Sequence, residues 1–167
     1  MAGSVTFILL YLLSLTTFEE NQDTSVLSSQ SSEEVASTRE TATVSRVIDG
    51  DTIELTTGEK VRYIGMDTPE LRPNECYGKE ATERNKKLVE NKKVEMEKDI
   101  SKTDRYGRLL RYVYLEDKMI NRILVQEGYA RVATYPPDVK YQKIFLEDER
   151  KAREAEKGLW GKICEEV

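Results

Sequence analysis

Three short runs rich in β-branched residues, separated by turns that contain glycine, occupy residues 41–66. The runs are TATVSRVI, DTIELT and KVRYIGM, and the turns between them are Asp49-Gly50 and Thr57-Gly58. β-Branched residues favour strands, and glycine paired with a small polar residue favours a tight turn. This part of the chain therefore predicts three strands that form a meander.

The remainder of the chain predicts two further strands and three helices. Apolar spacing and glycine stops place a helix at residues 78–90, strands at 92–98 and 108–115, and helices at 117–126 and 137–157. The order βββαββαα predicts an α+β fold in which a five-stranded β-barrel is flanked by three helices. The oligonucleotide-binding (OB) fold is the closest architecture with that strand count.

The first 40 residues have a different composition from the body of the chain. Residues 5–18 form an apolar run that is shorter than the roughly 20 residues of a membrane span, which favours a signal peptide. An uncleaved membrane anchor and a mis-assigned start are the alternatives. Residues 19–40 are rich in Ser, Thr, Glu and Gln and predict a disordered linker. We therefore expect an exported, secreted or extracytoplasmic protein with its domain at residues 41–167.

Charge and histidine content limit the classes of function. Six acids and one arginine lie in residues 1–41, so the 31 acids and 26 bases of the chain leave residues 42–167 neutral. A neutral body argues against coating nucleic acid by bulk attraction, although it allows a local cationic site. The chain has no histidine, the commonest zinc ligand and the commonest general base near neutral pH. Acid–base chemistry must therefore use carboxylates, Lys, Tyr or Cys.

Two acidic blocks lie at the ends of predicted strands: DGDT at residues 49–52 and DTPE at residues 67–70. A meander brings the start of its second strand and the end of its third to one edge, so Asp51 should lie beside Asp67. Two carboxylates and a backbone carbonyl such as that of Thr68 make an oxygen-only site that suits calcium. Each block alone is also compatible with an ordinary solvated turn. Their pairing favours the metal site.

A third block, TDRYGR at residues 103–108, places Arg105, Tyr106 and Arg108 around a glycine turn. Arginine binds phosphate oxygens bidentately, so this turn is a candidate phosphate clamp. The alternative is a hairpin turn with solvated basic residues.

In this order, the three blocks resemble the staphylococcal nuclease (thermonuclease) family, and the resemblance covers residues 41–160. It implies an OB-fold barrel with three helices and a calcium-activated nuclease that acts on DNA and RNA. By this resemblance Asp51 and Asp67 are calcium ligands together with the carbonyl of Thr68. Glu70 is the general base, and Arg62 and Arg108 bind phosphate.

The nucleotide-contacting positions depart from the family pattern in two places. Arg105 stands where the family usually has lysine, whereas Tyr106 matches the family tyrosine that contacts nucleotide. The family has two tyrosines one residue apart after the last strand. Here Thr134-Tyr135 precedes two prolines, so Tyr135 is expected to replace one of them.

Cys76 and Cys164 are the two cysteines of the chain, too few for a zinc site. We expect them to form a disulfide, because export places the domain where disulfides persist. The alternative is a pair of buried thiols in a cytoplasmic protein.

The main alternative function is a non-catalytic SNase-like module that binds nucleic acid or protein. A more remote alternative is a surface-tethered, calcium-stabilised adhesion or scaffold domain. The acids and arginines proposed for catalysis are all present, which favours the nuclease: Asp51, Arg62, Asp67, Glu70 and Arg108. We further expect a monomer, with residues 5–18 as its possible membrane tether.

Overall fold

The computed structural model describes residues 39–72 and 75–164. The expected signal peptide or anchor at residues 1–18, and all of the expected linker except Arg39 and Glu40, lie outside the described residues. The first strand, β1 (Glu40–Val47), begins at the last residue of the expected linker. Within the described residues, no helix is both long enough and apolar enough to span a membrane.

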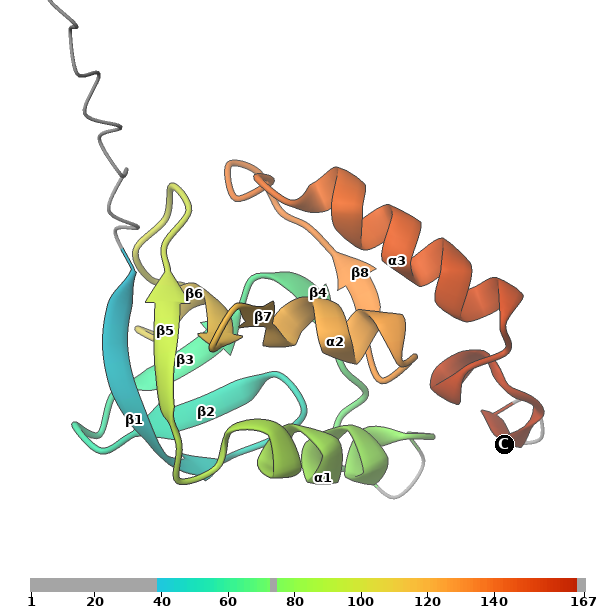
Figure 1. Cartoon of the computed structure of the whole chain (residues 1–167), viewed down its shortest axis with the longest axis horizontal. Coiled ribbons are helices and arrows are strands. Elements are labelled where there is room, and N and C mark those ends of the chain that lie inside the picture. The colour runs from blue at the N-terminus through green and yellow to red at the C-terminus, as the bar shows by residue number, and fades with distance from the viewer. Residues whose placement is uncertain (1–38, 73–74, 165–167) are drawn as a thin grey trace, which may run out of the picture. The chain divides into compact units, whose positions relative to one another are not determined.

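Five strands close into a barrel (Figure 1). The antiparallel order β3-β2-β1-β5-β6 forms most of the wall, and a parallel pairing of β3 with β6 closes it. The predicted five-stranded barrel of an α+β fold is confirmed. The strands that join β1 in the wall are β2 (Thr52–Leu55), β3 (Lys60–Tyr63), β5 (Lys93–Glu97) and β6 (Leu109–Leu115).

Alternating side chains of these strands fill the barrel. Successive residues of a strand point to opposite faces, so every second residue enters the interior. Burial of this apolar surface is the main force that holds the barrel closed. Each of the five strands contributes a residue that is at most 1% exposed: Val44, Ile53, Val61, Val94 and Val113.

The third predicted strand is interrupted, and this changes where Asp67 lies. The run KVRYIGM was expected to be one strand, but the chain turns at Ile64 and continues as β4 (Gly65–Asp67), which pairs with β8 (Arg131–Ala133). Gly65 has a φ of 82°, and a Cβ there would lie 2.3 Å from the ring of Phe145. Only glycine permits this turn and this close approach. The turn carries Asp67 out of the barrel wall.

The helices agree with the prediction in number and differ at their ends. They are α1 (Gly78–Val89), α2 (Ile120–Gln126) and α3 (Gln142–Glu154). The prediction of a helix from residue 117 was wrong at its start, because β7 (Lys118–Met119) first forms a hairpin with β6. Two short 3₁₀ helices follow α3, at Gly158–Trp160 and Lys162–Cys164.

The last helix starts later than expected. We predicted it from residue 137, but residues 135–141 have another use. Tyr135 and Asp138 form an isolated β-bridge, and the Asp138 carboxylate accepts hydrogen bonds from the N–H groups of Ile100 and Ser101. These contacts hold the segment before α3 against the loop that follows β5.

Candidate active site

A groove of about 870 Å³ brings together most of the residues singled out in the sequence. β3, β4, the loop after β4, the turn before β6 and the segment after β8 all contribute to its lining. Asp51 and Thr68 do not line the groove and are buried residues. The predicted site residues that do line it are Arg62, Asp67, Glu70, Arg105, Tyr106, Arg108 and Tyr135.

Asp51 connects the turn between β1 and β2 to the loop after β4. Its Oδ2 accepts hydrogen bonds from the backbone N–H of Thr68 (3.0 Å) and from the Thr68 hydroxyl (3.2 Å), and its Oδ1 accepts one from the Thr52 hydroxyl (3.1 Å). A Cβ on Gly50 would lie 2.5 Å from Oγ1 of Thr68, so glycine is needed for this close packing. The structure thus brings the two acidic blocks into contact.

One guanidinium joins the two carboxylates of these blocks. Arg62 on β3 donates to Oδ1 of Asp51 through Nη1 and to Oδ1 of Asp67 through Nη2. The Asp51 side chain is almost fully buried, whereas that of Asp67 is 58% exposed. Arg62 therefore lies between a carboxylate beneath the site and one that faces the groove.

Like charges crowd this cluster. Burial raises the pKa of Asp51 to about 7 against the opposing pull of Arg62, and the nearby carboxylates of Asp49 and Asp67 push it in the same direction as burial. Burial acts to lower the pKa of Arg62, but Asp51 and Asp67 outweigh it and the pKa lies above its ordinary value. One arginine thus serves several carboxylates, and an added cation is electrostatically favoured here.

The atoms of this cluster that could bind a metal ion are all oxygens. Asp51 and Asp67 supply carboxylates, and the backbone carbonyl of Thr68 belongs to the same loop. Across residues 39–72 and 75–164, no three His, Cys, Asp or Glu side chains gather into a ready metal centre. The site therefore fits a hard cation that takes oxygen ligands and few protein charges.

The loop with Glu70 is anchored at the start of α1. A Cβ on Gly78 would lie 2.2 Å from the carbonyl oxygen of Glu70, so the first residue of α1 packs directly on this backbone. The backbone N–H of Glu70 donates to Oε2 of Glu75 at 2.6 Å. The Glu70 residue itself is exposed and lines the groove. The Glu70 carboxylate thus has no partner among the described residues, while its backbone is fixed by Gly78 and Glu75.

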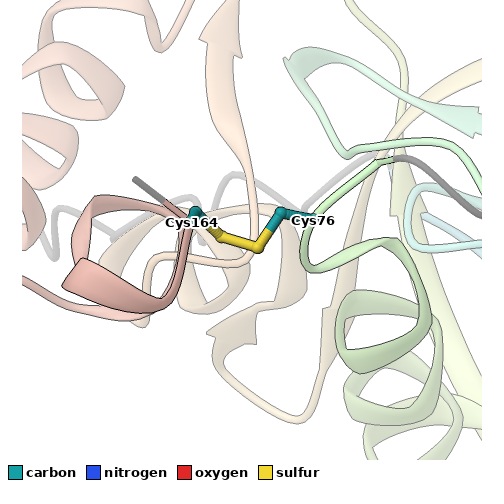
Figure 2. Close-up of a disulfide and its surroundings, with 2 residues drawn as sticks. All are labelled: Cys76 and Cys164. Atoms are coloured by element: carbon teal, nitrogen blue, oxygen red, sulfur yellow. A yellow bond between two sulfur atoms is a disulfide. The ribbon is translucent and has the colours of Figure 1, made fainter. Parts of the chain in front are cut away.

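A disulfide joins this region to the end of the described chain. Cys76 and Cys164 are bonded to each other, with a Cα–Cα distance of 5.6 Å (Figure 2). Cys76 lies just before α1, and Cys164 is the last residue of the second 3₁₀ helix. The bond therefore ties the start of α1, against which the Glu70 backbone packs, to the segment after α3.

Arg108 is oriented by Asp104, a residue that was not among the predicted site residues. Asp104 Oδ1 accepts hydrogen bonds from the N–H groups of Tyr106 and Arg108, both at 2.9 Å, and Oδ2 accepts from Arg108 Nε at 2.7 Å. Burial acts to raise the pKa of Asp104, but these bonds outweigh it and lower the pKa. Aspartate at the start of a tight turn commonly binds backbone N–H groups ahead of it, and this signal was available in the sequence.

Two exposed tyrosines lie at the groove. Tyr106 is 68% exposed and Tyr135 is 75% exposed, and both line the groove. Arg105 donates to the Tyr106 hydroxyl at 2.6 Å, and its guanidinium carbon lies 4.8 Å from the centre of the Tyr106 ring. Exposed aromatic rings beside arginines are suitable surfaces for stacking nucleic-acid bases.

Comparisons with known proteins agree with this geometry. The family profile described as "Staphylococcal nuclease homologue" matches residues 60–162, more than half of the chain. The chain belongs to the staphylococcal nuclease family. This finding bears out the resemblance inferred from the three sequence blocks.

Curated relatives are similar over most of the chain. Endonuclease YncB of Bacillus subtilis (strain 168) is 45% identical over 129 residues, which are 72% of this chain and 61% of the relative. The SPbeta prophage-derived endonuclease YokF of the same strain is 43% identical over 129 residues, 72% of this chain and 44% of the relative. The thermonuclease of Staphylococcus hyicus is 43% identical over 128 residues, 72% of this chain and 76% of the relative. The chain thus covers less than two thirds of the length of the two Bacillus relatives.

Proposed function

We propose that this protein is a calcium-dependent endonuclease that hydrolyses phosphodiester bonds in DNA and RNA. The observation that carries the proposal is the groove, where an exposed carboxylate (Glu70) and two anchored arginines (Arg62 and Arg108) lie beside the paired aspartates. Relatives named endonuclease and thermonuclease support the same activity.

Calcium is the cation that the donor set favours. Asp51, Asp67 and the carbonyl of Thr68 would hold it, and all three provide oxygen. When bound, calcium supplies a positive charge that polarises the phosphate and helps to orient the attacking water. Only two protein carboxylates would hold it, so we expect a dissociation constant on the order of 10⁻⁴–10⁻³ M.

The side chains of the groove divide the hydrolysis between them. The Glu70 carboxylate accepts a proton from the water that attacks phosphorus, the bond from phosphorus to the leaving oxygen breaks, and that oxygen takes up a proton from solvent water. Arg62 and Arg108 donate hydrogen bonds to the phosphate oxygens, where negative charge increases during attack. Asp104 holds Arg108 by its Nε, and Asp51 and Asp67 hold Arg62. These contacts keep the guanidinium groups in place before substrate binds.

The aromatic groups support a broad choice of substrate. Tyr106 and Tyr135 are exposed at the groove and provide faces on which bases stack. Stacking tolerates every base because each base has a π-face. Arg105 adds a positive charge beside Tyr106. We therefore expect little base preference and activity on both DNA and RNA.

The experiment is cleavage of plasmid DNA, single-stranded DNA and RNA with calcium, followed by excess chelator. We expect cleavage at submillimolar to millimolar calcium and its loss on chelation. Magnesium should substitute poorly, because its small octahedral shell tolerates irregular ligands badly. Full activity after exhaustive chelation would overturn the calcium proposal. Tight binding without cleavage in calcium would instead favour the non-catalytic binding module.

We also propose that the protein works outside the cytoplasm. The apolar run at residues 5–18 and the bond between Cys76 and Cys164 support this location. The experiment is fractionation of cells that express the full chain, with antibody detection in medium, membrane and cytoplasm. Recovery of all the protein in the cytoplasm, with both thiols free, would contradict the proposal.

A further inference from the structure

A second charged cavity lies outside the groove. It has a volume of about 480 Å³ and is lined by Glu40, Lys98, Lys102 and Arg111. These residues come from the start of β1, the position after β5, the loop that follows it, and β6. We name this feature the barrel-mouth cavity. Three of its four lining residues are cationic, so it carries a net positive charge.

Strand alternation places charge where a barrel normally has apolar side chains. Arg111 lies on the same face of β6 as Leu109 and Val113, which belong to the barrel core. Glu40 likewise shares its face of β1 with Val44. Glu40 is on the inward face at the first residue of β1, where its side chain is 58% exposed. Because successive residues of a strand alternate between faces, Arg111 is at an interior position near one end of the barrel. An ionic group at such a position requires a compensating partner.

The partners of Arg111 are incomplete. Its side chain is 2% exposed, and Nη1 donates to the carbonyls of Leu110 (2.8 Å) and Lys102 (3.1 Å). Nη2 donates to Oε2 of Glu40 at 3.3 Å, whereas the buried Nε has no partner among the described residues. On the Nε–Nη2 edge of Arg111, therefore, only Nη2 has a hydrogen-bond partner among the described residues.

Another arginine of the molecule shows what full use of this edge looks like. Arg84 binds Glu127 bidentately, with Nε at 2.6 Å and Nη2 at 2.7 Å from the two carboxylate oxygens. Glu40 makes a single, longer contact with Arg111, and two lysines add positive charge nearby. An oxyanion such as phosphate presents the oxygens that this edge binds best.

The cavity and the groove share a wall. Asp104, Arg105 and Tyr106 line the groove, whereas Lys98 and Lys102 of the same loop line the cavity. Between them, the N–H groups of Ile100 and Ser101 bind Asp138, which also lines the groove. Lys102 directly follows Ser101, a step of about 3.8 Å between Cα atoms. The groove and the barrel-mouth cavity are therefore neighbours across this loop.

We propose that the barrel-mouth cavity binds one backbone phosphate of a single-stranded nucleic acid whose neighbouring nucleotides lie in the groove. The Nε–Nη2 edge of Arg111 binds the phosphate oxygens, and Lys98 and Lys102 neutralise its charge. Glu40 is the competing anion that this phosphate displaces. The inference rests on the proposed function, because it extends the same substrate beyond the groove.

The test compares a short strand that fills the groove with a longer strand that extends beyond it. All proteins carry Glu70→Gln to prevent cleavage, and binding is followed by fluorescence anisotropy across a range of salt concentrations with calcium present. Lys98→Gln/Lys102→Gln removes two exposed charges and leaves Arg111 in place. For the longer strand, the slope of log K against log salt should become shallower by about 0.7, the value of one phosphate contact with a single strand. The short strand should bind unchanged.

Two further variants complete the test: one should tighten binding of the longer strand, and the other is a control that should have no effect. Glu40→Gln removes the competing carboxylate and should tighten binding of the longer strand only. Lys118→Gln/Lys143→Gln removes two exposed lysines elsewhere, on β7 and α3, and should change neither strand. Arg111 itself is left unchanged in every variant, since it also binds the carbonyls that hold the loop.

Each result decides for or against the inference. An unchanged slope for the longer strand in Lys98→Gln/Lys102→Gln would overturn it, and so would equal weakening of both strands. A titration with inorganic phosphate that shifts the Arg111 Nε–H resonance, while the longer strand does not, would assign the cavity to a free anion instead. If the short strand also fails to bind the parent protein, the proposed function itself is wrong. If the short strand binds and the cavity variants leave the longer strand unaffected, the proposed function stands and only the cavity proposal fails.

Discussion

Asp51 and Glu97 are both buried carboxylates, 1% and 9% exposed, but their surroundings have opposite effects. Glu97 accepts hydrogen bonds from Tyr114 (2.9 Å), from Tyr141 (3.0 and 3.1 Å) and from the ammonium of Lys140. Burial acts to raise the pKa of Glu97, yet these donors outweigh it and the pKa is lowered. Donors from β6 and from the segment just before α3 thus satisfy this one carboxylate.

Asp51 has strong donors too, but it shares the chief one. Arg62 binds both Asp51 and Asp67, and burial raises the pKa of Asp51 to about 7. The difference teaches that a structural carboxylate is given its own donors, whereas the site places several carboxylates around one arginine. Such crowding lowers stability on its own and is relieved by a cation. The contrast supports a role for Glu97 in the fold and the proposed metal-binding role of Asp51.

The largest effect should come from Glu70, which belongs to the functional side of this comparison. Glu70→Gln keeps the shape of the side chain and removes the proton acceptor, so turnover should fall by about 10²–10⁴-fold. Binding of nucleotide and the free energy of unfolding should hardly change, since the residue is exposed. Steady-state cleavage rates measure the turnover, and calcium-dependent binding assays measure the affinity for nucleotide.

The matched control is Glu80→Gln on α1, an exposed glutamate outside the groove. It should retain wild-type turnover. If Glu70→Gln lost binding and turnover in parallel, Glu70 would belong to the structural side or to the metal shell.

The next largest effect should come from the two arginines of the groove. Removing Arg62 or Arg108 should cost about 2.7–4 kcal/mol of transition-state stabilisation, by analogy with the loss of one oxyanion donor. Arg62→Lys and Arg108→Lys should recover only part of this, because lysine lacks the planar fork that binds two phosphate oxygens. The measurement is kcat/KM for a defined oligonucleotide.

Arg122 provides the structural counterpart to these arginines. It binds Asp148 bidentately between α2 and α3, with Nε at 2.7 Å and Nη2 at 3.1 Å. Arg122→Lys should lower the free energy of unfolding and leave kcat/KM unchanged. Near-wild-type turnover for both Arg62→Lys and Arg108→Lys would contradict bidentate phosphate binding and favour a general electrostatic role.

The sequence predicted the barrel, the three helices and the pairing of the two acidic blocks. Alternating β-branched runs and glycine turns are local signals, so the strands of the meander were accessible without a structure. β4 and β8 were not expected, since three-residue strands carry almost no periodicity and the contact between Gly65 and Phe145 is remote in sequence. Short elements of this kind depend on tertiary packing.

The use of Asp138 needed the structure, whereas the place of Asp104 at the start of a glycine turn already indicated its contacts with backbone N–H groups. Asp104 was counted as part of a basic turn, although its carboxylate holds the whole turn and Arg108. Asp138 binds backbone N–H groups 37 and 38 residues away, and no pattern in the sequence carries that information. The interior position of the cationic Arg111 could be recognised only from the strand register.

The disulfide should affect stability more than chemistry. It closes a span of 88 residues between Cys76 and Cys164, so Cys76→Ser/Cys164→Ser should lower the free energy of unfolding by about 2–5 kcal/mol. Turnover at low temperature should change little, because the Glu70 backbone also packs on Gly78. Urea unfolding of the oxidised protein and of the double variant provides the measurement. A large loss of kcat with little loss of stability would instead place the bond among the groups that position Glu70.

The smallest effect should come from the pH dependence that Glu97 confers. Its pKa is lowered in the folded protein, so its stabilising contribution is fully present above the unfolded value of about 4.3 and is lost as pH falls through the folded value. Glu97→Gln should cost about 1–3 kcal/mol at pH 7, because hydrogen bonds to a charged acceptor are weakened. The difference in free energy of unfolding between the variant and the wild type should become smaller as the pH is lowered below 4. Urea unfolding at pH 7 and pH 3 measures it, with Glu80→Gln as the exposed control. A gap that stayed constant down to pH 3 would show that Glu97 acts by packing and not by charge, and the contrast with Asp51 would fail.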